Sequence, residues 1–405
     1  MERSDLIPKE HRAERAFLLD LLGADAVNAE AAATIDPAVF LAVAPKTLHP
    51  YLHWKLQQAG DRVPPALRSL FADAYRENAF RQLRRMADLR RIDGVLKAAN
   101  IPYLLLKGPI LAATAYPEPA TRTMLDLDLL LHEPDVPRAI SALAEIGFTV
   151  PLKFAGWTMN AGDAPPLFNG QPGSPVVELH AMLDSAPDDS HAVEKMWSTA
   201  RVVDLGHGLG VHALERIEFF AHVVTHVSRH HRFEGELRSL LDVVLLLRSN
   251  ESDFDWSAAK AEWTQRGIDA WIQLTLSLAN VMLGSRIPEA FAEGAPDSEA
   301  LALAAEQLWA DKEKKISEKI TYLLAGFEPS PVHSSVKGKP VPIPTGLAGM
   351  RFRAVRQWQR VHRIFTTLRD GRLRPRNITE NVHLFRNRQR LFTLVESANR
   401  STRRS

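Results

Sequence analysis

The sequence contains no cysteine, which excludes disulfide bonds, thiolate nucleophiles, cysteine-ligated zinc sites and iron–sulfur clusters. Only His, Asp and Glu side chains remain as strong metal ligands. No run of roughly 18 to 20 apolar residues is present either, because candidates such as Leu104–Leu106 and Val243–Leu247 are flanked by charge, so we expect no membrane span. The first residues also lack the apolar segment and cleavage pattern of a secretory signal. We therefore expect a cytoplasmic protein, and the Ala- and Arg-rich composition suggests a bacterial source.

The 405 residues, 45% of them hydrophobic and 24% charged, have the composition of a globular protein of two or three compact units. The net charge of +2 hides an asymmetry along the chain. Residues 351–405 contain 15 Arg, no Lys and 3 acidic residues, whereas the first 350 carry 35 basic and 45 acidic residues. The protein is thus an acidic body with an arginine-rich tail.

Helical signals alone fill an N-terminal region at residues 1–98. Between Phe80 and Leu96 apolar residues recur every three or four positions among many Arg, which predicts an amphipathic helix with a solvated basic face.

An α/β core is expected at residues 99–200. Ile101–Leu106 has the composition of a buried strand, and Lys107-Gly108-Pro109 then opens a helix. Met124–Leu131 and Val176–His180 alternate as half-buried strands do. The predicted fold class is α+β, a small mixed sheet between N-terminal and C-terminal helical regions.

Helical signals return in the last third of the chain, including a long helix over residues 259–283. We assign a helical domain to residues 201–328, a Pro-rich linker or loop to 329–348, and an Arg-rich helical tail to 349–405.

Asp126 and Asp128 are two residues apart on a predicted strand, so both carboxylates point to one face while Leu125, Leu127 and Leu129 occupy the other. Neighbouring carboxylates repel unless a cation lies between them, and oxygen ligands suit Mg²⁺ or Mn²⁺. The alternative is an edge strand whose Asp residues merely face water.

The surroundings of this pair favour phosphate chemistry. Upstream, Lys107-Gly108 lies at a strand-to-helix turn, where backbone N–H groups favour a phosphate. Downstream, Glu178 and His180 share one strand face and offer a third carboxylate and a base. Arg122 could neutralise phosphate charge or form a surface salt bridge. Three carboxylates and a phosphate-binding turn together indicate two-metal phosphoryl transfer.

The run LLLKGPILAATAYPEPATRTMLDLDLLL, the later VVELH, and a His-rich helix followed by Leu-Arg-x-Leu-Leu-Asp242 resemble the uncharacterised nucleotidyltransferase family of the polymerase-beta-like superfamily. The resemblance covers roughly residues 15 to 250. It implies that Asp126, Asp128 and Glu178 hold the metal ions, and that Lys107-Gly108 binds the nucleotide phosphates. Arg122 and His180 match further family positions. The turn departs from the superfamily pattern, Gly-Ser or Gly-Gly, because Lys107-Gly108-Pro109 supplies no hydroxyl.

A second constellation is a histidine series on one helix face, at His222, His226 and His230, with His231 adjacent. With Asp242 it could form the metal site of a hydrolase, although His222-Val-Val-Thr-His226 is not a zinc-protease motif. The histidines could instead pack at an interface, or His226 and Asp242 could contribute to acceptor binding beside a nucleotide cleft.

The arginine-rich tail allows three interpretations. Its Arg residues and interleaved aromatic rings could bind RNA, its amphipathic pattern could contact an anionic membrane surface, or it could fold back on the acidic body.

The hypothesis from the sequence is Mg²⁺-dependent transfer of NMP from an NTP to an acceptor hydroxyl with release of pyrophosphate. The acceptor could be a small molecule, a peptide or tRNA. The alternatives are a non-catalytic nucleotide- or RNA-binding protein of the same fold, and the histidine-based hydrolase.

Overall fold

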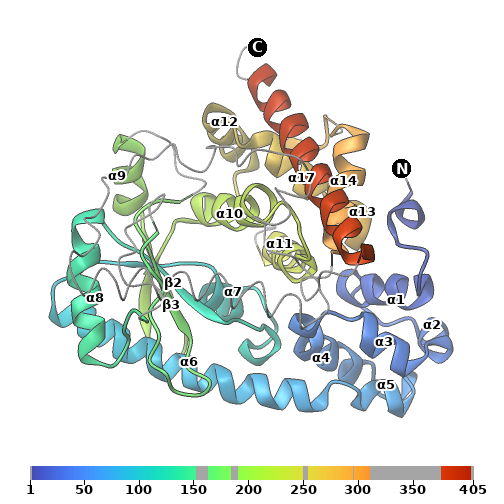
Figure 1. Ribbon diagram of the computed structural model, residues 1–405, viewed down its shortest axis with the longest axis horizontal. Helices are drawn as coiled ribbons and strands as arrows, with labels where there is room; N and C mark the ends of the chain where they lie inside the picture. Colours follow the sequence, from blue (N-terminus) through green and yellow to red (C-terminus); the bar gives the residue numbers. More distant parts are fainter. Residues whose placement is uncertain are drawn as a thin grey trace.

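The computed structural model describes residues 2–151, 163–183, 190–249, 254–294, 296–310 and 375–402. A five-stranded sheet lies on one side of the molecule, and helices from both ends of the chain gather on the other (Figure 1). The fold is therefore α+β, with a small mixed sheet among many helices, as the sequence predicted. Among the described helices, none combines the length and the hydropathy that a membrane crossing requires.

Short helices make up the N-terminal part of the chain. They are α1 (Arg12–Gly23), α2 (Ala29–Thr34), α3 (Pro37–Val43), α4 (His49–Ala59) and α5 (Pro65–Ser69). The Asn28 and Asp36 side chains accept hydrogen bonds from first-turn amides and so start α2 and α3. Buried rings of Phe17, Phe40 and Phe71 pack edge to face in the core of this cluster.

The long helix α6 (Ala72–Ala98) runs from this cluster across the bottom of the view in Figure 1 to a place below the sheet. Its first half does not bury the predicted apolar face, because Phe80 and Leu83 are 74% and 67% exposed. The buried stripe is polar and contains Asn78, Gln82, Arg85 and Asp88. The predicted burial of the apolar positions was therefore wrong for this half, since the neighbouring turn offers carbonyl oxygens that bind the amide side chains of Asn78 and Gln82. The basic face remains exposed at Arg76 and Arg81. From Leu89 onward the apolar face is buried as expected.

The sheet has the strand order β3–β2–β1–β5–β4. Its strands are β1 (Leu104–Leu105), β2 (Asp126–Leu130), β3 (Val176–His180), β4 (Arg201–Asp204) and β5 (Gly210–Ala213). β2 runs parallel to β3 and antiparallel to β1, while β5 runs parallel to β1 and antiparallel to β4. The hairpin β4–β5 was not predicted, since four residues per strand give too short an alternation. The sheet thus extends beyond residue 200, the expected end of the core.

Three helices connect or border the strands of the sheet, namely α7 (Gly108–Thr114), α8 (Val136–Glu145) and α9 (Ser190–Ser198). α7 follows β1 directly, and α8 packs against α6.

The remaining helices of the body are α10 (Arg216–Thr225), the π-helical turn η7 (His226–His230), α11 (Leu237–Ser249), α12 (Trp256–Arg266), α13 (Asp269–Leu283) and α14 (Ser298–Leu308). The single helix expected over residues 259–283 is instead two helices. Gly267 adopts a φ of 66° and ends α12, because this left-handed conformation cannot continue a right-handed helix.

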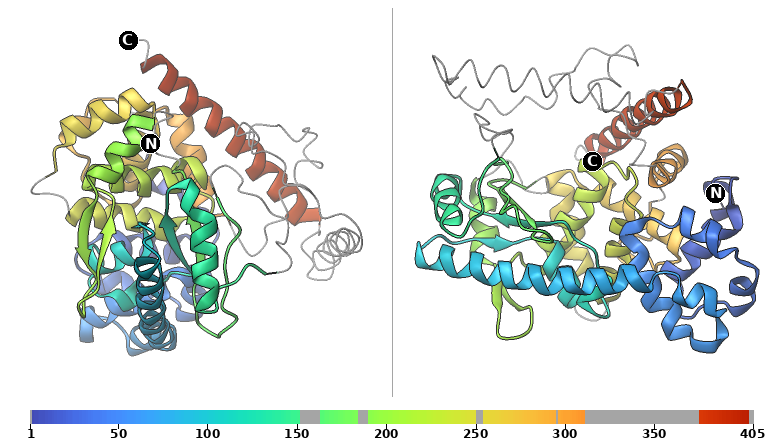
Figure 2. Two further views of the ribbon diagram at one scale, coloured as in Figure 1. Left: turned by 90° about the vertical axis from the view of Figure 1, so that its left-hand side faces the viewer. Right: turned by 60° about the horizontal axis from the view of Figure 1, so that its bottom comes forward.

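The last described element is α17 (Pro375–Thr402), which packs on α13 and α14 (Figure 1 and Figure 2). Arg388 forms an ion pair with Glu234, and Trp271 Nε1 donates to Glu396 at 2.8 Å. These contacts agree with the interpretation that the tail folds back on the acidic body. The predicted linker at 329–348 and residues 349–374 of the tail lie outside the described residues.

Candidate active site

The parallel pairing of β2 and β3 brings two of the sequence-predicted carboxylates, Asp128 and Glu178, together, whereas Asp126 is not part of this close group. Asp128 and Glu178 are register partners, and Asp126 lies two residues before Asp128 on the same face. Leu127 and Leu129 are fully buried on the opposite face and fix this orientation. Asp126 and Asp128 therefore do not sit on a water-facing edge, since β2 has a neighbour on each side.

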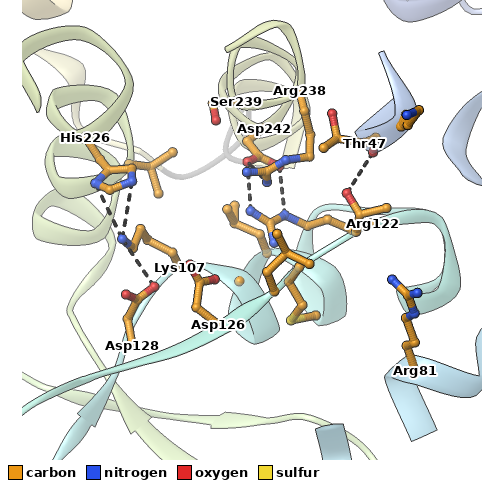
Figure 3. Close-up of a pocket in the computed structure, with 17 residues that line it drawn as sticks. Thr47, Arg81, Lys107, Arg122, Asp126, Asp128, His226, Arg238, Ser239 and Asp242 are labelled. Atoms are coloured by element: carbon orange, nitrogen blue, oxygen red, sulfur yellow. Dashed lines mark hydrogen bonds and ion pairs between the residues drawn. The ribbon is translucent and has the colours of Figure 1, made fainter. Parts of the chain in front are cut away.

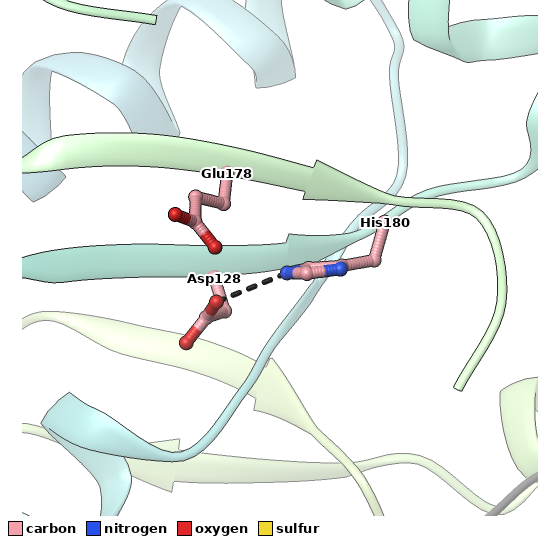
Figure 4. A group of neighbouring side chains, drawn as sticks. All are labelled: Asp128, Glu178 and His180. Carbon is pink, nitrogen blue, oxygen red and sulfur yellow. Dashed lines mark hydrogen bonds and ion pairs between the residues drawn. The ribbon is translucent and has the colours of Figure 1, made fainter. Parts of the chain in front are cut away.

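Asp128, Glu178 and His180 form one cluster on this face (Figure 4). One ligand atom of each lies within 4.8 Å of the others. His180 Nε2 is 3.0 Å from Asp128 Oδ1, and its Nδ1 is 2.8 Å from Asp163 Oδ1. Both ring nitrogens of His180 are thus engaged by carboxylates.

The side chains in this cluster shift one another's pKa values. Burial alone would lower the pKa of His180, but hydrogen bonds to Asp128 and Asp163 outweigh it and raise the pKa to about 9. Burial would raise the pKa of Asp128, but the charge of Lys107 and the bond to His180 bring it below its ordinary value. The pKa of Glu178 is raised by burial and by the charges of Asp128 and Asp126. His180 is therefore a protonated partner of Asp128 at neutral pH, which opposes a role as base.

Lys107 lies between β1 and α7 with a φ of 35°, a strained conformation for a residue with a side chain. Its Nζ is 3.2 Å from Asp128 Oδ2 and 3.4 Å from both ring nitrogens of His226. Gly108 fits closely against its neighbours, because a Cβ there would lie 3.3 Å from Arg122 Nη1 and 3.2 Å from Met124 Sδ, so these side chains would have to move by a few tenths of an ångström. The strained turn thus holds a cation directly against the β2 carboxylate.

Arg122 and Asp242, predicted as separate site residues, bind each other (Figure 3). Nε and Nη2 of Arg122 both donate to the carboxylate at 2.8 Å, and Tyr116 and Arg238 donate to it at 2.7 and 3.1 Å. Burial would raise the pKa of Asp242, but Arg122 and Arg238 lower it. The salt bridge of Arg122 is therefore buried and not on the surface, and Asp242 neutralises the charge of Arg122.

The histidine series lies across the site from the carboxylates, at the end of α10 and in η7. His226 Nε2 is 3.0 Å from His231 Nε2, and the rings of His226 and His230 stack. Burial, together with the charge of Lys107, holds the pKa of His226 well below its ordinary value. Over the described part of the chain, the group of three close ligand atoms consists of Asp128, Glu178 and His180, and the histidine series forms no such group.

A cavity of about 290 Å³ opens between these groups (Figure 3). Its walls come from α6, α7, β2, α10, α11 and the turn before α4. The charged residues among its lining are Lys46, Arg81, Lys107, Arg122, Asp126, Asp128, Arg238 and Asp242. A space this size, with carboxylates at one side and several cations around it, suits an anionic ligand together with a metal ion.

Sequence reasoning missed several residues of the site. Arg238 could have been found, because it precedes Asp242 by one helical turn. Asp163 and Tyr116 gave no signal, since both lie in irregular segments and meet their partners only through the fold.

A family model described as an uncharacterised nucleotidyltransferase matches residues 34–284, more than half of the chain. No curated protein and no solved structure matches the sequence.

Proposed function

The chain belongs to the uncharacterised nucleotidyltransferase family, and we propose that it transfers NMP from an NTP to an acceptor hydroxyl with release of pyrophosphate, using Mg²⁺. One observation carries this proposal. The register of β2 and β3 places Glu178 opposite Asp128 and on the face of Asp126, beside a cavity lined by cations.

Asp126, Asp128 and Glu178 are the proposed metal ligands. Their chemistry fits a divalent cation, because the three carboxylates lie on one face of the sheet and burial and the charges of Asp126 and Asp128 destabilise the anionic form of Glu178. When bound, Mg²⁺ supplies positive charge to the phosphates and acidifies the acceptor hydroxyl. His180 positions Asp128 through a hydrogen bond that Asp163 anchors from the other side.

The remaining residues supply charge and proton transfer. Lys107 and the Gly108 amide are proposed to bind the triphosphate, since Nζ lies where the carboxylates meet the cavity. In the reaction the acceptor oxygen forms a bond to the α-phosphorus, and the bond from that phosphorus to the pyrophosphate oxygen breaks. The hydroxyl proton passes to Glu178. Arg122 and Asp242 keep the turn after α7 fixed to α11, and His226 borders the acceptor side of the cavity.

Calorimetric titration with ATP, GTP, CTP and UTP tests the proposal. The wild type should bind one NTP in the presence of Mg²⁺ and much more weakly with EDTA. The double variant Asp126→Asn/Asp128→Asn should lose this binding. The variant Asp61→Asn/Asp73→Asn removes the same charge at exposed positions and should bind like the wild type. A folded wild type that binds no NTP would refute the proposal.

A non-catalytic nucleotide-binding protein is the second candidate function. It is favoured by the pairing of Asp128 with Lys107 and His180, because these two cations already neutralise the carboxylate. Label at the α-phosphate separates the two functions. Transfer of this label to a component of a cell extract, with stoichiometric pyrophosphate, supports catalysis; binding without either product supports the second candidate.

A further inference from the structure

The side chain of Arg85 on α6 is buried. The residue is only 4% exposed, and Nε and Nη1 have no hydrogen-bond partner among the residues that the structure describes. An unpaired buried charge is costly, and the large majority of buried polar groups in proteins are satisfied. Arg85 therefore needs an explanation other than packing.

The neighbours of Arg85 place it next to the candidate active site, although Arg85 itself is not among the residues that line the cavity. Arg81 precedes it by one helical turn and lines the cavity, as Figure 3 shows. Gln82, on the same side of α6, donates to the carbonyl oxygen of Arg122 at 2.6 Å. Burial, with a further contribution from Arg81, lowers the pKa of Arg85 to about 10, while Asp126 acts in the opposite direction. Arg85 is thus within electrostatic range of Arg81, Arg122 and Asp126.

Arg81, Arg85 and Arg122 differ in whether a carboxylate pairs with them. Arg122 is neutralised by Asp242, and Arg81 pairs with the exposed Glu77. The charge of Asp126 attracts Arg85, and no hydrogen bond from Nε or Nη1 of Arg85 reaches it among the described residues. If Asp126 ligates a metal ion, as in the proposed function, its charge is shared and Arg85 is left without a counter-ion.

We propose that Arg85 and Arg81 form an anion subsite at the α6 side of the cavity, which takes a phosphate group of a substrate. A guanidinium presents parallel N–H donors that match phosphate oxygens, and two such groups one helical turn apart can hold one phosphate. The phosphate belongs either to the triphosphate of the NTP or to the acceptor. This inference extends the proposed function, but the anion subsite can be measured without it.

The variant Arg85→Met tests the subsite, because it keeps most of the side-chain volume and removes the charge. Binding of inorganic phosphate, pyrophosphate and ATP is measured by calorimetry on the full chain, with Arg85→Lys as the conservative variant. Arg84→Met on the adjacent position is the matched control, since Arg84 is bonded to Gln171 on the outside of α6. We expect Arg85→Met to weaken phosphate or pyrophosphate binding at least tenfold, Arg85→Lys to retain part of it, and Arg84→Met to leave it unchanged.

The ATP titration distinguishes the two sources of the phosphate. Parallel loss of ATP and pyrophosphate affinity identifies the triphosphate, whereas loss of inorganic phosphate affinity with unchanged ATP affinity identifies a phosphorylated acceptor. Unchanged binding of all three ligands in folded Arg85→Met would overturn the proposal. That outcome is distinct from failure of the proposed function, in which the wild type itself binds no NTP with Mg²⁺.

The melting temperature gives a second and independent readout. Because a buried unpaired charge is replaced by an apolar side chain, Arg85→Met should melt at or above the temperature of the wild type without ligand. The phosphate-induced rise in melting temperature should be smaller in the variant. A clear drop in the melting temperature would mean that Arg85 serves the fold, and would contradict the subsite.

Discussion

Two buried aspartates on either side of the cavity, Asp242 and Asp128, have opposite surroundings. Asp242 receives two bonds from Arg122 and one each from Arg238 and Tyr116, so its charge and its oxygen atoms are satisfied. Asp128 has one contact from Lys107 and one from His180. The carboxylates of Asp126 and Glu178 lie on the same face of the sheet. The first network is electrostatically complete and holds elements together. The second contains three carboxylates, Asp126, Asp128 and Glu178, and we propose it as the cation site.

The largest effect that tests this contrast is expected at Asp242. Replacement by Ala leaves Arg122 buried without its carboxylate, and should lower the free energy of unfolding by about 3–5 kcal/mol. Urea denaturation measures the change. The control Asp25→Ala removes an exposed carboxylate that pairs with Arg248 at 3.6 Å, and should cost less than about 1 kcal/mol. If both variants lost the same unfolding free energy, the buried ion pair of Asp242 would contribute no more to stability than the exposed pair of Asp25.

The pH dependence of the unfolding free energy should show whether His180 is held as a cation beside Asp128. The pKa of His180 is raised in the folded state, so its contribution is fully present below the unfolded pKa near 6.5 and is lost as the pH rises through about 9. The difference in unfolding free energy between the wild type and His180→Gln should fall by on the order of 3 kcal/mol over this range, measured with EDTA. A difference that stays constant from pH 6 to 10 would show that His180 is not held as a cation.

Asn substitutions at Asp126 and Asp128 should differ in their effect on stability but should both abolish nucleotide binding. Asp128→Asn weakens two contacts with charged partners and should lower the unfolding free energy by about 1.5–3 kcal/mol, whereas Asp126→Asn should change it by less than about 0.5 kcal/mol. Both variants should lose Mg²⁺-dependent NTP binding. Retained binding in Asp126→Asn would restrict the metal site to Asp128 and Glu178.

The smallest effect is expected at Arg238. Its side chain is 24% exposed and contacts Asp242 at 3.1 Å, while Arg122 already neutralises that carboxylate. Arg238→Met should therefore lower the unfolding free energy by only about 0.5–1 kcal/mol. If Arg238→Met lowered the unfolding free energy as much as Asp242→Ala, Arg238 rather than Arg122 would be the main partner that stabilises Asp242.

Local sequence patterns predicted the parts of the site that depend on strand alternation. Asp126, Asp128 and Glu178 were identified because alternation places side chains on known faces, and β2 and β3 follow it. The pairing of Arg122 with Asp242 could not be predicted, because the two residues are 120 positions apart and meet through tertiary packing. Likewise, the exposure of Phe80 and the burial of Arg85 contradict helix amphipathicity, since amide side chains of the polar stripe of α6 donate hydrogen bonds to a neighbouring turn.

Binding of Mn²⁺, measured by electron paramagnetic resonance, tests most directly whether the β2 and β3 carboxylates form a cation site. The wild type is titrated with Mn²⁺ in the presence of a non-hydrolysable NTP analogue, alongside Glu178→Gln and Asp126→Asn. We predict bound Mn²⁺ in the wild type and a loss of at least tenfold in affinity in each variant. Absence of bound Mn²⁺ in the wild type, or equal affinity in all three proteins, would contradict the assignment of these carboxylates as metal ligands.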